Sequence, residues 1–79
     1  MTSYIKHLNE IMRRAGAEPT LENKQLLDNI IREITGLEKA DSADVWKQVK
    51  NIMFSGDDAK KKRFEELVVK RMVKRMVTG

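Results

Sequence analysis

The chain has 79 residues, of which 35% are charged and 41% hydrophobic, and its formal net charge at pH 7 is +4. This length allows one domain, and the composition is that of a folded globular protein rather than a disordered chain. The absence of cysteine excludes disulfides and thiolate metal sites, and no run approaches the ~20 apolar residues that would span a membrane.

The first predicted helix covers about residues 3–15, because its apolar residues recur every three or four positions. Ser3 or Thr2 suits its N-cap, and Gly16 suits its end. The segment carries charged residues between single apolar positions, which is not the pattern of a signal peptide. Together with the missing cysteines, this leads us to expect a cytoplasmic protein.

The second predicted helix covers about residues 20–35. Pro19 cannot continue a preceding helix, and the hydroxyl of Thr20 suits the N-cap. Gly36 favours a left-handed stop, and Leu37 supplies the hydrophobic contact that follows such an ending.

The third predicted helix covers about residues 42–54, with Asp41 or Ser42 as its cap and Ser55-Gly56 as its end. A helix-turn-helix formed by the second and third helices is disfavoured. Arg32 stands where that motif needs a small residue, and the linker of residues 37–41 is long for its tight turn.

The fourth predicted helix covers about residues 57–78. Residues 55–79 hold eight basic and four acidic residues (+8 − 4 = +4), whereas residues 1–54 hold eight of each. The segment therefore carries the whole net charge. Acids lie at its start and bases near its end, which also suits the helix dipole.

Two faces divide the end of this fourth helix. Its apolar half comprises Val68, Val69, Met72, Val73, Met76 and Val77, and its basic half comprises Lys70, Arg71, Lys74 and Arg75. Phe64 and Leu67, however, project toward the basic half, so one straight helix cannot bury both apolar sets against one surface. Either the helix bends, or the other helices surround it, or the later apolar stripe meets a partner.

No segment alternates polar and apolar residues for long enough to predict a strand. The sequence therefore predicts an all-α fold: a single compact domain of four helices over residues 1–79, with partly orthogonal packing as one option. The expected core residues are Tyr4, Leu8, Ile11, Leu27, Ile30, Ile34, Val45, Trp46, Val49, Ile52, Phe64 and Val68.

The sequence offers little for catalysis, so we expect no enzyme, no catalytic residues, no cofactor and no metal site. His7 is the only histidine, and with Glu10 it supplies at most half of a metal site. The adjacent acids of the chain point about 100° apart on a helix and do not form a proton-sharing pair. The glycines are isolated, so no phosphate-binding loop is present.

The basic, amphipathic fourth helix is the main candidate for function, and two hypotheses use its two faces. In the first, Lys70, Arg71, Lys74 and Arg75 bind nucleic acid. An acidic protein or an anionic membrane surface would also suit this charge, and a solvated basic face without a ligand is the remaining interpretation. In the second, Met72, Val73, Met76 and Val77 bind a protein, with a homodimer as one form of that interaction. The sequence predicts a small binding module in either case.

Overall fold

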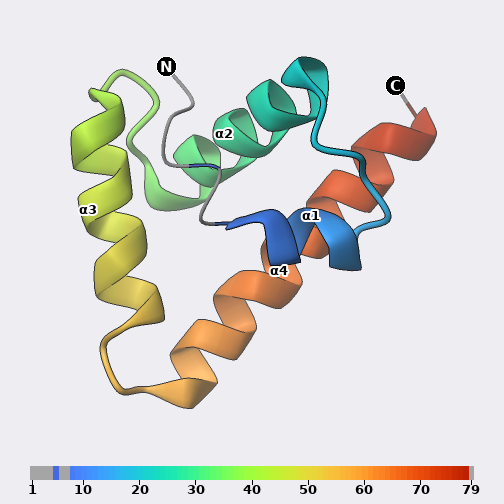
Figure 1. Cartoon of the computed structure of the whole chain (residues 1–79). Coiled ribbons are helices and arrows are strands. Elements are labelled where there is room, and N and C mark those ends of the chain that lie inside the picture. The colour runs from blue at the N-terminus through green and yellow to red at the C-terminus, as the bar shows by residue number, and fades with distance from the viewer. Residues whose placement is uncertain (1–4, 6–7, 79) are drawn as a thin grey trace.

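Local sequence signals fix both ends of the second helix in the computed structural model, which describes residue 5 and residues 8–78 (Figure 1). Helix α2 spans Leu21–Thr35, and the backbone N–H of Asn23 donates to Thr20 Oγ1 at 3.1 Å. At the other end Gly36 has φ of 74°, a left-handed conformation that glycine adopts without a steric penalty. The N–H of Leu37 then donates to the carbonyl of Arg32. The predicted cap and stop are both confirmed.

The other three helices are α1 (Asn9–Arg14), α3 (Ser42–Met53) and α4 (Asp58–Thr78). Asp41 holds the N-cap position of α3, although its side chain makes no cap bond. Asp57 precedes α4, and its carboxylate accepts from the N–H of Lys60 at 3.1 Å. The described residues contain no strand, so the all-α prediction is confirmed.

Helix α1 is shorter than predicted. The expected caps Thr2 and Ser3 lie outside the described residues, but Ile5 and Leu8 are described and are not α-helical. Leu8 is the residue before the helix, with φ of −115° and ψ of 19°. Both side chains are almost fully buried. Packing into the core therefore takes precedence over continuing the helix toward the N-terminus.

Helix α4 is the common partner of the other three helices. Its 21 residues give a length of about 32 Å, which matches the 32 Å longest dimension of the molecule. It packs against α1, α2 and α3, and α2 also packs against α3. Figure 1 shows α3 and α4 joined by a turn at one end of the molecule, with α4 running from there across its whole length. The radius of gyration is 11.7 Å, as expected for a compact chain of this size.

The core contains most of the predicted residues and several others. Ile34 and Trp46 are only partly buried, and Tyr4 lies outside the described residues; the other predicted core residues are buried. The buried hydrophobic residues that the prediction missed are Ile5, Met12, Ala15, Ala17, Ile31 and Met72.

A single row of side chains resolves the conflict between the faces of α4. Phe64, Val68 and Met72 are all buried, and each lies four residues after the last. Four residues turn the helix by about 400°, so the row drifts by only about 40° per step and stays on one side. The helix buries this row and leaves Leu67 and the last apolar residues exposed. The expected conflict between Phe64 with Leu67 and the apolar residues of 68–77 disappears, because only one member of the first set and two of the second are buried.

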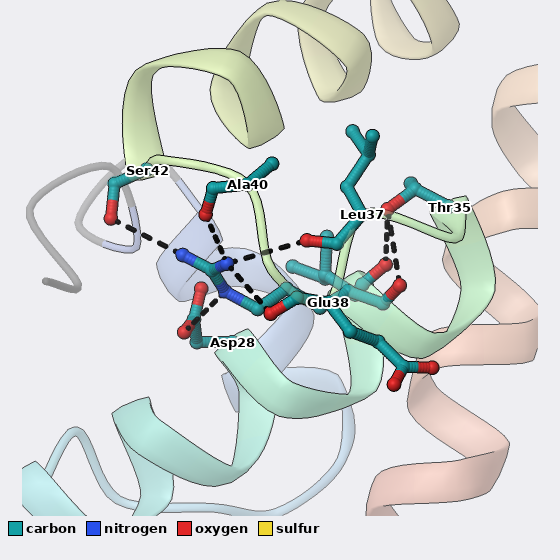
Figure 2. Close-up of polar contacts among 8 residues, drawn as sticks. Asp28, Thr35, Leu37, Glu38, Ala40 and Ser42 are labelled. Carbon is teal, nitrogen blue, oxygen red and sulfur yellow. Dashed lines mark hydrogen bonds and ion pairs between the residues drawn. The ribbon is translucent and has the colours of Figure 1, made fainter.

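Arg32 organises the connection between α2 and α3, and the residues that it contacts there are labelled in Figure 2. Its Nε donates to Asp28 Oδ2 at 3.0 Å, one turn earlier on α2. Its Nη1 donates to the carbonyls of Leu37, Glu38 and Ala40, and its Nη2 approaches Ser42 Oγ at 3.5 Å. The residue that argued against a helix-turn-helix thus holds the longer loop in place.

Candidate nucleic-acid interface

The structure separates the four basic residues that the sequence analysis grouped on one face. Lys70 and Lys74 are exposed, whereas Arg71 and Arg75 are half-buried at the edge of the core. Arg75 Nη2 donates to Glu33 Oε1 on α2 at 2.5 Å. The predicted set therefore consists of two exposed lysines and two arginines on the side that faces α2.

Electrostatics at this edge agree with the separation. The hydrogen bond from Arg75 lowers the pKa of Glu33, and the nearby charges of Arg75 and Arg71 act in the same direction. The same hydrogen bond raises the pKa of Arg75. Arg75 and Glu33 thus form a partly exposed charge pair between α4 and α2.

A different set of cations lies along the solvent side of α4. We call the exposed residues Lys60, Arg63, Lys70 and Lys74 the α4 basic stripe. With Leu67 they follow the spacing 60, 63, 67, 70, 74, which keeps residues on one side of a helix. Lys60, Arg63 and Lys70 have no ion-pair partner among the described residues.

The α4 basic stripe is long, and its four charged members are all cations. From residue 60 to residue 74 it covers about 21 Å of helix axis. Of the exposed acids of α4, Asp58 lies away from the stripe, whereas Glu66, three residues after Arg63 and four before Lys70, borders it. The sequence analysis missed Lys60 and Arg63 because it treated the run of residues 60–63 as surrounding a whole turn, although the spacing of these two residues from Lys70 and Lys74 was visible in the sequence.

A second exposed surface lies on the outer side of α3. Lys47 and Lys50 are exposed and three residues apart, so they share one side of this helix, and the exposed Phe54 follows its last residue. The ammonium of Lys50 lies 5.7 Å from the centre of the Trp46 ring, within cation–π distance. The sequence analysis did not find this group, although its helical spacing was visible. We call Trp46, Lys47, Lys50 and Phe54 the α3 outer face.

The four residues proposed for protein binding are divided as well. Met72 is 0% exposed and belongs to the core, so it is not part of any surface. Val73 and Met76 are each 40% exposed, and Val77 is 81% exposed. With half-buried Val69 these three form an apolar patch at the end of α4.

Among the described residues, no three His, Asp or Glu side chains gather closely enough to hold a metal ion. His7 lies outside the part of the chain that the structure describes. No described helix combines the length and apolar character needed to cross a bilayer.

No family model, curated protein or solved structure matches this chain.

Proposed function

We propose that this protein is a small, non-enzymatic module that binds the phosphate backbone of nucleic acids through the α4 basic stripe. The observation that carries the proposal is the placement of Lys60, Arg63, Lys70 and Lys74, all exposed, along about 21 Å of one helix. Nucleic acid is a linear array of closely spaced phosphates, and a straight row of cations matches such an array better than a compact anionic ligand.

The charges of the rest of the molecule support the same proposal. Residues 1–54 contribute no net charge, so the positive field is concentrated on the C-terminal helix. Arg75 is paired with Glu33 and Arg71 lies near the same carboxylate, and neither of them belongs to the stripe. Contacts of this kind recognise the backbone and not the base sequence, because they do not reach base edges.

Salt dependence tests the proposal. Four phosphate contacts predict that affinity falls about 150-fold between 50 and 200 mM salt for duplex DNA, and about 50-fold for a single strand. We expect Lys70→Ala/Lys74→Ala to weaken binding and to lower the slope of log affinity against log salt by about two. The matched control is Lys24→Ala/Lys39→Ala, which removes the same charge from α2 and the following loop and leaves the slope unchanged. The proposal would be refuted if neither DNA nor RNA binds at about 20 mM salt, or if the binding does not weaken as salt is added.

A second candidate function is protein binding, favoured by the apolar patch of Val73, Met76 and Val77 at the end of α4. Lys70 and Lys74 border this patch, so an acidic amphipathic helix is the partner that fits its charge. A second copy of the chain would bring these lysines close to their own copies. Sedimentation at high protein concentration tests self-association: association that Val73→Lys/Val77→Lys abolishes supports a homodimer, and a monomeric wild type excludes it. Met72 is unsuitable for this test because it lies in the core.

A further inference from the structure

Phe54 combines high exposure with a fixed backbone. It follows the last residue of α3 and is 70% exposed. Its N–H donates to the carbonyl of Lys50 at 2.8 Å. The next residue, Ser55, is bonded through its hydroxyl to the Ile52 carbonyl and to the Asp57 N–H. A ring held out on a bonded turn loses little conformational freedom when it binds a flat ligand.

Cations lie on both sides of Phe54 along the chain. Before it, Lys47 and Lys50 share one side of α3. After it, the turn of residues 54–57 leads directly into α4, where Lys60 and Arg63 begin the α4 basic stripe. Asp57 is also in this turn, but its carboxylate accepts the N–H of Lys60 and so caps α4.

We propose that the ligand is a single-stranded polynucleotide and that Phe54 stacks on one of its bases, while Lys47 and Lys50 on one side and the α4 basic stripe on the other hold the flanking phosphates. This inference rests on the proposed function and adds the strandedness of the ligand. An unpaired strand can turn a base face toward a protein aromatic ring, whereas the bases of a duplex stack on one another. A phenyl ring has no hydrogen-bonding group, so the stacking tolerates any base.

The Lys50–Trp46 pair supports this assignment. Trp46 is partly buried and packs against the core, and the Lys50 ammonium lies over its ring. The contact holds the Lys50 ammonium at the α3 outer face, where it can meet a phosphate next to the stacked base. Because Trp46 is the only tryptophan in the chain, its fluorescence reports on events at this face without a label.

The test uses two oligonucleotides of equal length and charge: (dT)12, and a 12-mer in which every base is removed. We expect the wild type to bind (dT)12 more tightly than the abasic strand, because one stacked base contributes about 5- to 150-fold in affinity. Phe54→Ala is expected to lose that advantage and to bind both strands alike, and Phe54→Trp to restore it. The matched control is Leu21→Ala, at a residue that is 67% exposed at the start of α2; it should leave both affinities unchanged.

The outcomes separate this inference from the proposed function. If Phe54→Ala binds (dT)12 as tightly as the wild type, stacking is refuted and backbone binding stands. If the wild type binds a 12-base-pair duplex as tightly as (dT)12, the single-strand assignment is refuted. If no strand binds in a salt-sensitive way, both proposals fail together. A parallel titration with (rU)12 shows whether RNA serves as well as DNA, and equal affinity supports a stacking contact that ignores the sugar. Circular dichroism melting confirms that each variant is folded.

Discussion

Replacing Arg32 by alanine is the sharpest test of how the fold is held together. The guanidinium of Arg32 donates hydrogen bonds to Asp28 and to three loop carbonyls, and it approaches Ser42. The Arg32 and Asp28 side chains are 13% and 11% exposed. The variant therefore leaves a largely buried carboxylate without its arginine and removes the donor that fixes the α2–α3 loop.

The size of the effect follows from these contacts. Breaking a fully buried ion pair by removing one partner costs about 3–5 kcal/mol. The loop carbonyls of this protein are near the surface and can turn to water, which reduces the loss, so we expect about 2–4 kcal/mol. A chain of this length has a total stability of about 4–12 kcal/mol. Arg32→Ala should therefore lower the melting temperature by roughly 8–30 °C.

Urea unfolding followed by circular dichroism at pH 7 measures this loss. Arg32→Lys should retain only part of the stability, because an ammonium cannot bond the carboxylate and the loop carbonyls in the same fork geometry. The control is Arg13→Ala, which removes an exposed ion pair to Glu10 on α1 and should cost less than about 0.5 kcal/mol. An equally small loss of unfolding free energy for Arg32→Ala would show that the α2–α3 loop keeps its conformation without Arg32, and would refute this reasoning.

Three further predictions concern the core, a charge pair and a turn. Met72→Ala should lower the free energy of unfolding by about 2–5 kcal/mol, whereas Met76→Ala, half-exposed on the same helix, should cost under about 1 kcal/mol; similar losses in urea unfolding would contradict the assignment of Met72 to the core. The bond from Arg75 lowers the pKa of Glu33 in the folded state, so its stabilising effect is present above the ordinary glutamate pKa and is lost as the pH falls through the lowered value. Glu33→Gln should remove this part of the stability change below about pH 4.5, and an unchanged pH profile in urea unfolding would count against the pair. Gly36→Ala should cost about 1 kcal/mol because of its φ of 74°, although a Cβ there meets nothing within 4 Å; a thermal melt unchanged from that of the wild type would argue that this backbone conformation is not needed.

The helix boundaries that depend on local chemistry could be predicted from the sequence. Thr20 caps α2 because its own hydroxyl reaches an N–H three residues away, and Gly36 ends α2 because no side chain opposes a positive φ. The start of α1 could not be predicted in the same way. Ile5 and Leu8 fit a helical pattern, but their conformation is decided by the core into which they pack.

The candidate site shows the same division. The excess of positive charge on the last helix is a property of the sequence. The pairing of those charges cannot be read from the sequence, because Arg75 is bonded to Glu33 on α2, a residue 42 positions away in the chain. Likewise Met72 is buried because three helices meet α4. A helical wheel of α4 alone contains neither fact, and so it grouped buried and exposed residues together.

The central place of α4 also sets the order in which this protein can form during synthesis. The ribosome makes α1, α2 and α3 first, and each of them has its main packing surface on a helix that does not yet exist. The nascent chain must therefore wait, with much of its apolar surface in contact with water or a chaperone, until Met72 has left the exit tunnel. Folding of the first three helices alone would leave that surface uncovered, so the core is completed only when α4 is available.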